Sequence, residues 1–311
     1  MKKAPRPLLH FLVLLLSLLS AALVLLLLPG CKSSPPSRPR VVVSIYPLFD
    51  LARRVAGPDA EVSLLLSPGK SEHGFERTPQ AVEAAGRAQL GIMVGLGLDP
   101  WLESLLKESA PKARLLKSGD RVPTRALDAE HSGDSGPFMG DEAAIDPHVW
   151  LDPQRARLIV RAIGEELSRV DPPHATAYRD RATEVDRSLE ELDKELAART
   201  MALPRRSLVT FHAGFGYFAE RYGLEILAIL EPSPGTAPTE AHLAGIRAIL
   251  RDRKVPALYS EPQLDPGPAK RLSEEARIPL GVLDPMGGGP ETDSYEKLLR
   301  HNVAQLEKLQ R

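Results

Sequence analysis

The stretch HATAYRDRATEVDRSLEELDKELAART, residues 174–200, is the longest helical pattern in the chain. Its apolar residues recur at spacings of three, four and seven, which places them on one face of a helix. These residues are Tyr178, Val185, Leu189, Leu192 and Leu196. Pro172 and Pro173 precede the pattern and Pro204 follows it, as expected at the two ends of a helix. A helix of this length covers about 40 Å, enough to connect two lobes.

On both sides of this helix, short apolar runs alternate with amphipathic segments. Before it, strands are expected at 40–46, 61–66, 90–95 and 114–117, and helices at 48–56, 79–89, 100–109 and 154–169. After it, strands are expected at 207–211, 225–230, 257–260 and 280–283, and helices at 217–222, 239–253, 268–276 and 294–309. This alternation predicts an α/β fold with parallel-type sheets. The sequence therefore predicts an N-terminal lobe at 41–170, a linking helix at 171–203 and a C-terminal lobe at 204–311. Parallel sheets bind ligands at the carboxyl ends of their strands, so the site is expected in the cleft between the lobes.

The N-terminus carries positive charge at Lys2, Lys3 and Arg6, followed by an apolar run at 11–28 that is long enough to span a bilayer. A retained anchor and a removed export signal both fit such a run. Residues 28–31, LPGC, resemble a bacterial lipobox, although Pro29 is unusual at its position. The resemblance favours a signal peptide at 1–30 and lipidation of Cys31. Residues 31–40, with three prolines and few apolar groups, are expected to form a flexible stalk.

Composition limits the classes of function. Cys31 is the only cysteine, so the mature fold is expected to lack disulfides and to build any metal site from nitrogen and oxygen ligands. The formal net charge is −1, with both signs interspersed, which predicts no nucleic-acid partner. Aromatic residues make up only 5% of the chain, which also disfavours a surface for stacking sugars or bases.

Three of the eight histidines stand where strands end or loops turn: His73, His148 and His212. Loops at such positions can converge on one point, so a shared metal site is possible. Spacing alone leaves the alternative of three unrelated histidines open, because no short motif such as HExxH marks a local site. Of the others, His10 is expected to leave with the signal peptide and His131 to lie in an irregular loop. His174, His242 and His301 are expected to be ordinary surface or cap residues.

The sequence around these histidines resembles one family. The matching motifs are PGKSEHGFERTP (68–79), DPHVWLDP (146–153), FH (211–212) with YFAERYGL (217–224), SEPQ (260–263) and LDPMG (283–287). Together they are similar to the cluster A-I metal-binding lipoproteins, the solute-binding proteins of ABC importers for zinc and manganese. The resemblance implies two α/β lobes bridged by a rigid helix, with the metal between the lobes. Carried over residue by residue, it implies His73, His148, His212 and Asp284 as ligands.

The expected metal is Zn²⁺, because three imidazoles and one carboxylate suit a borderline cation, whereas manganese prefers more oxygen ligands. Manganese-type members of the family carry a carboxylate at the third ligand position, where this chain has His212. Zinc-type members often carry Glu beside the first histidine, so Glu72 is an alternative to Asp284 as fourth ligand. The region 119–146 contains a single histidine, His131. In this it differs from the histidine-rich loop of many zinc-type members. Because ligating histidines must be neutral, metal affinity is expected to decrease steeply at pH values below about 6.

The resemblance thus predicts a monomeric, exported carrier that is lipid-anchored, faces the periplasm or the cell exterior, and delivers Zn²⁺ to an ABC importer permease. It is not expected to be an enzyme. The alternatives are a manganese or iron carrier of the same family, a zinc hydrolase with an open coordination position and Glu72 as general base, and an adhesin that shares the fold.

Overall fold

The computed structural model describes residues 38–72, 74–127, 144–232 and 236–311. These residues belong to one compact unit, Arg38–Arg311. The predicted signal peptide, Cys31 and most of the predicted stalk lie outside the described residues, as does His73. Within the described ranges, no helix combines the length and the apolar character that crossing a membrane requires.

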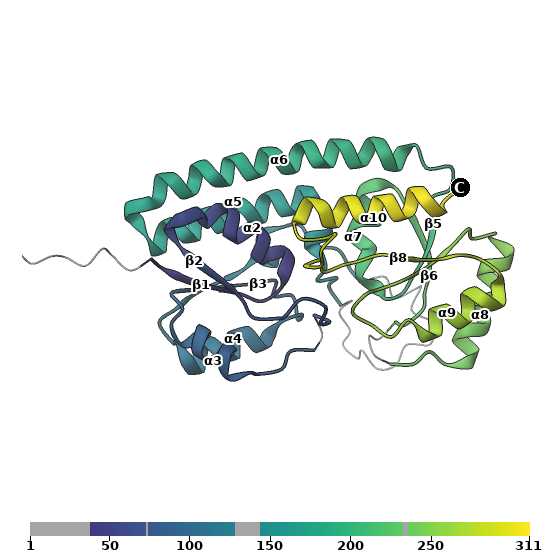
Figure 1. Ribbon diagram of the computed structural model, residues 1–311, viewed down its shortest axis with the longest axis horizontal. Coiled ribbons are helices and arrows are strands. Elements are labelled where there is room, and N and C mark those ends of the chain that lie inside the picture. The colour runs from purple at the N-terminus through teal and green to yellow at the C-terminus, as the bar shows by residue number, and fades with distance from the viewer. Residues whose placement is uncertain (1–37, 73, 128–143, 233–235) are drawn as a thin grey trace, which may run out of the picture. The chain divides into compact units, whose positions relative to one another are not determined.

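The N-terminal half contains a four-stranded, fully parallel sheet in the order β2-β1-β3-β4. Its strands are β1 (Arg40–Val43), β2 (Glu61–Leu64), β3 (Leu90–Met93) and β4 (Arg114–Lys117). Helices α2 (Tyr46–Ala56) and α5 (Pro153–Val170) lie on one face, and α3 (Pro79–Gly86) and α4 (Pro100–Ser109) lie on the other (Figure 1). Successive side chains of a strand point to opposite faces. Accordingly, Val41 and Val43 join the core under α2 and α5, whereas Val42 packs with α3 and α4.

The C-terminal half contains two parallel two-stranded sheets, β5-β6 and β7-β8. The strands are β5 (Ser207–Thr210), β6 (Glu225–Ile229), β7 (Leu258–Ser260) and β8 (Leu280–Val282). The helices are α7 (Gly216–Tyr222), α8 (Glu240–Asp252), α9 (Gly267–Ala276) and α10 (Tyr295–Leu309). The predicted α/β fold with parallel-type sheets is therefore confirmed. Short 3-10 turns connect several elements: Gly57–Asp59, Ser118–Arg121, Val149–Leu151, Pro172–His174 and Ala213–Phe215.

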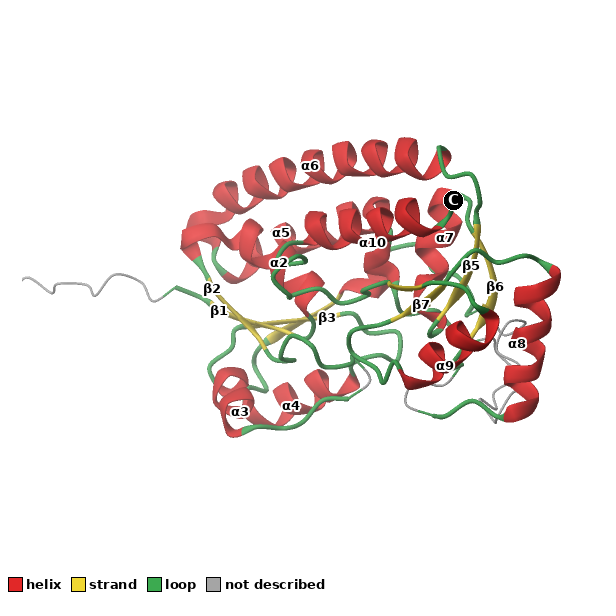
Figure 2. Cartoon of the chain, turned by 45° about the vertical axis from the view of Figure 1, so that its right-hand side comes forward, coloured by secondary structure: helices red, strands yellow, loops and turns green. Residues whose placement is uncertain are grey.

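The long helix α6 (Ala175–Met201) confirms the predicted linking helix. All five residues of its predicted apolar stripe are buried. It contacts α2 and α5 of the N-terminal half, and α7 and α10 of the C-terminal half, and Figure 2 shows α5, α6 and α10 together on one side of the strands. The α5–α6 approach is close at Gly164, where an added Cβ would lie 2.8 Å from Ala182 Cβ. Helices from both halves of the chain thus pack against the one helix α6.

One predicted boundary is wrong in an informative way. The strand expected at 40–46 ends at Val43, and Tyr46 already begins α2. The cause is Pro47, which has no N–H for a strand ladder and whose fixed φ suits the first turn of a helix. Ile45 remains extended and acts as the N-cap of α2.

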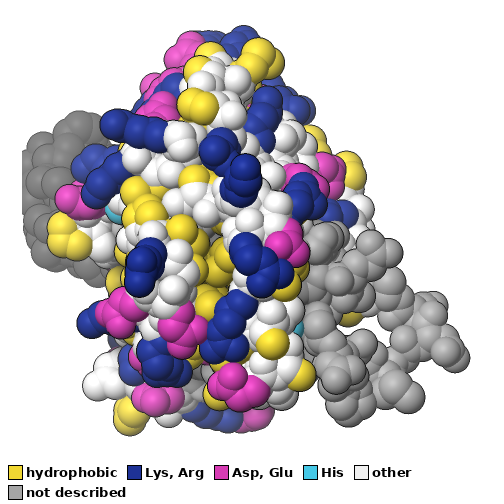
Figure 3. All heavy atoms as spheres, turned by 90° about the vertical axis from the view of Figure 1, so that its right-hand side faces the viewer, with side chains coloured by type: hydrophobic (Ala, Val, Ile, Leu, Met, Phe, Trp, Pro, Cys, Tyr) yellow, Lys and Arg dark blue, Asp and Glu magenta, His cyan; other side chains and the backbone are white. Residues whose placement is uncertain are grey.

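The face formed by the C-terminal half is mixed in character. Figure 3 shows Lys and Arg side chains spread over it with Asp and Glu between them, and apolar side chains near its middle. A groove between α8 and the C-terminal end of α9 is lined by Arg247, Leu250, Arg251, Glu275, Ala276 and Ile278. Interspersed charges of both signs give this face no single-sign field.

Candidate metal centre

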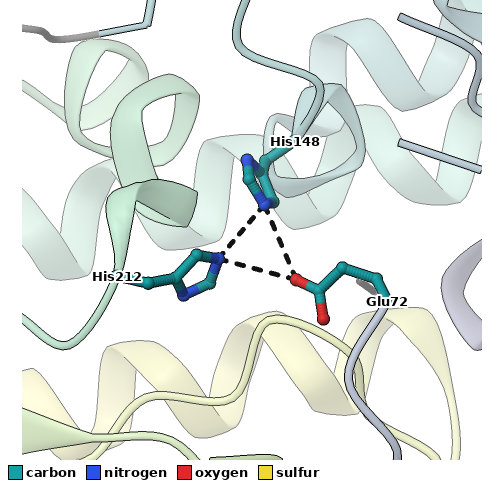
Figure 4. A group of neighbouring side chains, drawn as sticks. All are labelled: Glu72, His148 and His212. Carbon is teal, nitrogen blue, oxygen red and sulfur yellow. Dashed lines mark hydrogen bonds and ion pairs between the residues drawn. The ribbon is translucent and has the colours of Figure 1, made fainter. Parts of the chain in front are cut away.

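Three buried side chains direct nitrogen and oxygen atoms at one point (Figure 4). His148 Nε2 and His212 Nε2 are 3.1 Å apart. Glu72 Oε1 lies 3.6 Å from the first nitrogen and 3.5 Å from the second. Among the described residues, this is the one group of three or more His, Cys, Asp or Glu whose ligand atoms lie close enough to hold a metal ion.

The spacing of these atoms fits a tetrahedral ion. Zinc–nitrogen and zinc–oxygen bonds are about 2.0–2.2 Å long, so neighbouring ligand atoms of a tetrahedral zinc lie roughly 3.3–3.6 Å apart. The three observed separations, 3.1, 3.5 and 3.6 Å, cluster around that range. Two imidazoles and a carboxylate are also ligand types that zinc favours.

The three residues come from three different loops, two of which follow strands, and parallel sheets bind ligands at the carboxyl ends of their strands. Glu72 follows β2, and His212 follows β5 directly. His148 precedes the 3-10 turn Val149–Leu151, which leads into α5. The Asp152 carboxylate accepts a hydrogen bond from Gln154 N at 2.8 Å and so caps the N-terminus of α5.

The His148 ring is oriented by Asp146. One carboxylate oxygen, Oδ1, accepts from the His148 backbone N at 2.9 Å and from ring Nδ1 at 2.8 Å. An Nδ1–H that donates to a carboxylate leaves the Nε2 lone pair free to bind a metal. Asp146 is fully buried, and Arg125 Nη1 lies 3.3 Å from its other oxygen.

The His212 ring is oriented in the same manner by Glu261, which follows β7. Glu261 Oε1 accepts from the His212 backbone N at 3.2 Å and from ring Nδ1 at 2.6 Å. Both groups are buried, with 2% and 3% of their surface exposed. Each histidine therefore has a carboxylate behind it and presents Nε2 to the centre of the site.

Burial and charge compete within the group. Burial lowers the pKa of His212, but Glu261 and Glu72 outweigh it and raise that pKa to about 10. Burial likewise lowers the pKa of His148, and Asp146 with Glu72 raises it above its ordinary value. Burial raises the pKa of Glu72, yet hydrogen bonds with His148 and His212 hold it well below its usual range. Without metal, the buried carboxylates favour the protonated form of these imidazoles, so an incoming cation must displace protons.

The structure brings together His148, His212 and Glu72, but not Asp284. Asp284 is buried, and its Oδ1 accepts from Gln263 Nε2 at 2.8 Å and from the backbone N of Met286 and Gly287, each at 2.9 Å. Its Oδ2 accepts from Thr292 Oγ1 at 3.2 Å. His73 lies outside the described residues and is the chain neighbour of Glu72.

Sequence reasoning assigned no role to Asp146 or Glu261, the two carboxylates behind the histidines. Asp146 stands two residues before His148, and a carboxylate at that spacing was a readable signal. Glu261 was visible only as part of the SEPQ motif. Its link to His212 depends on β7 lying beside β5, which local sequence does not reveal.

Comparison with known proteins agrees with this geometry. The family model for the periplasmic zinc-uptake complex component A, ZnuA, matches residues 41–309. The zinc-binding lipoprotein AdcA of Streptococcus pneumoniae is 29% identical over 302 residues, which cover 94% of this chain and 60% of AdcA. A putative metal-binding protein of Treponema pallidum is 27% identical over 289 residues, covering 90% of this chain and 92% of that protein.

The fold is also found among solved structures. A crystal structure of ZnuA superposes with a TM-score of 0.79 at 24% identity, covering 88% of this chain and all of that one. The chain spans about three fifths of the length of the AdcA relatives. The family match covers nearly all the described residues, and this chain therefore belongs to the ZnuA family of periplasmic zinc-uptake components.

Proposed function

We propose that this protein captures Zn²⁺ outside the cytoplasmic membrane and delivers it to the permease of an ABC importer. The observation that carries the proposal is the convergence of two carboxylate-backed imidazole nitrogens and a carboxylate oxygen at one buried point. The name of the relative AdcA, a zinc-binding lipoprotein, supports zinc as the cargo and a lipid anchor at Cys31. Family membership supports a carrier that works with an importer permease. We expect it to be a monomer, because such a carrier must dock one permease.

The proposed ligands are His148, His212 and His73, completed by Glu72 or Asp284. Glu72 is favoured as the fourth ligand because its Oε1 already faces both Nε2 atoms. Asp284 uses both oxygens as acceptors of hydrogen bonds from Gln263, Thr292 and its own turn. The same placement weighs against the hydrolase alternative, because Glu72 lies among the ligand atoms and not beside an open coordination position.

The proposal is tested by offering Zn²⁺ and Mn²⁺ together to purified, metal-stripped protein at about pH 7.5. We expect one tightly bound zinc per chain by elemental analysis, with affinity measured by competition against a chelator. His148→Ala and His212→Ala should each weaken zinc binding by more than the roughly 10–100-fold typical for losing a residue that only orients a ligand. His242→Ala is the matched control. His242 lies on α8, and its Nε2 is hydrogen-bonded at 2.8 Å to the carbonyl of Ile229 on β6.

Two further variants identify the fourth ligand. If Glu72 completes the site, Glu72→Gln weakens zinc binding far more than Asp284→Asn does; the reverse order assigns the position to Asp284. Tight Mn²⁺ with little Zn²⁺ would move the protein to the manganese carriers. Absence of any tightly bound metal would overturn the proposed function altogether. Delivery is tested in cells that lack this protein. The wild-type chain should restore uptake of labelled zinc there, and His148→Ala should not.

A further inference from the structure

The backbone beside His148 is paired in an unusual way. Residues 125–127 and 144–146 run antiparallel around the bridge between Ala126 and Ile145. Leu127 N donates to Ala144 O at 2.7 Å, and Asp146 N donates to Arg125 O at 3.0 Å. In such a ladder, a hydrogen-bonded pair normally exchanges two direct bonds, so Arg125 N is expected to donate back to Asp146 O.

That return bond runs through the hydroxyl of Tyr217. Arg125 N donates to Tyr217 Oη at 3.0 Å, and the same hydroxyl donates to Asp146 O at 2.8 Å. A phenol hydroxyl has one proton to donate and accepts readily, so it satisfies both backbone groups at once. Tyr217 therefore fixes how far apart the Arg125 and Asp146 backbones lie.

The Tyr217 ring is itself firmly held. It is fully buried on α7, and the Arg155 guanidinium carbon lies 4.4 Å from the ring centroid. Such a cation–π contact adds to the packing of the ring. Tyr217 follows His212 by five residues, through the 3-10 turn Ala213–Phe215. One short, buried segment thus carries the His212 imidazole and the hydroxyl that contacts Asp146.

Gly216 makes this close approach possible. A Cβ at this position would lie 1.8 Å from Arg125 Nη1 and 2.6 Å from Asp146 Oδ2. Both distances are shorter than any van der Waals contact, so the start of α7 touches the Arg125–Asp146 ion pair directly. A side chain here would push that pair, and hence the carboxylate behind His148, out of place.

We propose that Tyr217 is a positioning residue that orients His148 through Asp146 and so sets the spacing of the two imidazoles. The inference rests on the proposed metal-binding function of the site. Without the hydroxyl, Arg125 N can donate directly to Asp146 O, which draws the Asp146 backbone toward Arg125. The Asp146 carboxylate then moves relative to His148 Nδ1, while His212 stays where β5 and Glu261 place it.

The test compares Tyr217→Phe with the matched control Tyr259→Phe. Tyr259 is also a buried tyrosine, and its hydroxyl accepts from Gln310 Nε2 at 3.2 Å. Losing a residue that hydrogen-bonds a metal-ligating side chain lowers metal affinity about 10–100-fold. Tyr217 acts one residue further away, so Tyr217→Phe should weaken zinc binding about three- to tenfold, and Tyr259→Phe should leave it unchanged. Unchanged affinity in folded Tyr217→Phe, beside a wild-type chain that binds zinc, would overturn the positioning role alone. A wild-type chain without zinc affinity would overturn the proposed function as well.

A double-mutant cycle with Asp146→Ala tests the route. If Tyr217 acts through Asp146, adding Tyr217→Phe to Asp146→Ala weakens zinc binding no further than Asp146→Ala alone. Additive losses would overturn the route. Cobalt-loaded Tyr217→Phe should show a shifted visible absorption spectrum, whereas Tyr259→Phe should match the wild type. Gly216→Ala gives a second variant at the same contact and is expected to exceed Tyr217→Phe in its effect on affinity; affinity equal to the wild type would contradict the proposal.

Discussion

The two imidazoles of the site receive the same support from differently constructed partners. In each case one carboxylate oxygen accepts both the backbone N–H and the ring Nδ1–H of its histidine. For His148 the carboxylate is Asp146, two residues earlier in the same loop. For His212 it is Glu261, 49 residues later, at the end of another strand.

The difference teaches that one chemical requirement can be met locally or through the tertiary fold. Asp146 orients His148 within a loop, and that loop is then fixed by Arg125 and Tyr217. Glu261 orients His212 and also ties the end of β5 to the end of β7. The first histidine therefore depends on a chain of contacts around its loop, and the second depends on the packing of two sheets.

Removing each carboxylate should have the largest effect on this comparison. Asp146→Ala and Glu261→Ala should each weaken zinc binding by about 10–100-fold, because each frees one imidazole to rotate and change tautomer. Both variants should also lower the melting temperature of the metal-free protein, since Asp146→Ala breaks the ion pair with Arg125 and Glu261→Ala breaks the ion pair with protonated His212.

A matched control for these variants exists elsewhere in the chain. Asp171 Oδ2 lies 2.7 Å from His174 Nδ1, an aspartate–histidine pair beside the start of α6. Asp171→Ala should leave zinc affinity unchanged. If Asp146→Ala and Glu261→Ala bind zinc as tightly as Asp171→Ala, the carboxylates are not what orients the two imidazoles.

The same contrast explains how much of the fold was predictable. The helix α6, its buried stripe and the alternating strands were predicted because periodicity and proline positions are local signals. Strand β1 was drawn too long because RVVVSIY remains β-branched and apolar up to the point where Pro47 starts α2. How strands group into sheets is not a local property, and the two separate sheets of the C-terminal half were not predicted.

The site was predictable to the same extent. His148 and His212 were chosen because they stand where strands end or loops turn, and the structure places their Nε2 atoms 3.1 Å apart. Glu72 was only an alternative, because nothing in a loop sequence shows which way a carboxylate points. Asp284 illustrates the converse: the following turn supplies N–H donors from Met286 and Gly287, which hold its carboxylate.

The pH dependence of zinc affinity should also distinguish the two histidines. This effect should be smaller than that of removing either carboxylate. The pKa of His212 is raised to about 10, so its imidazole is protonated at neutral pH in the metal-free protein. Zinc binds the neutral ring. Zinc affinity should therefore keep rising with pH well above pH 6, whereas with free imidazoles it would fall only below about pH 6. Glu261→Gln removes a cause of the raised pKa, so fewer protons should leave when zinc binds.

Proton release is measured by calorimetric zinc titrations at about pH 7.5 in buffers with different ionisation enthalpies. The wild-type heat should depend on the buffer, and the dependence should be weaker for Glu261→Gln. Equal buffer dependence in both proteins would mean that Glu261 orients His212 without controlling its protonation.

The smallest effect on affinity is expected from a second tyrosine that holds the His148 loop. Tyr295 of α10 donates its hydroxyl proton to Trp150 O at 2.6 Å, two residues after His148, just as Tyr217 contacts Asp146 two residues before it. Tyr295 contacts the backbone after His148, whereas the carboxylate of Asp146 comes before it in the chain. Tyr295→Phe should therefore cost about 1–2 kcal/mol of unfolding free energy, the typical price of a buried hydrogen bond left unmade, and change zinc affinity less than Tyr217→Phe.

Urea unfolding of the metal-free protein measures the first quantity, and chelator competition measures the second. Tyr259→Phe again serves as the reference for losing a buried hydroxyl. If Tyr295→Phe lowers stability and leaves zinc affinity nearly unchanged, the Asp146 carboxylate is what orients His148. If Tyr295→Phe instead weakened zinc binding as much as Tyr217→Phe, tethering of the backbone on either side would orient His148. The two histidines would then differ less than their partners suggest, because both would depend on contacts across the fold.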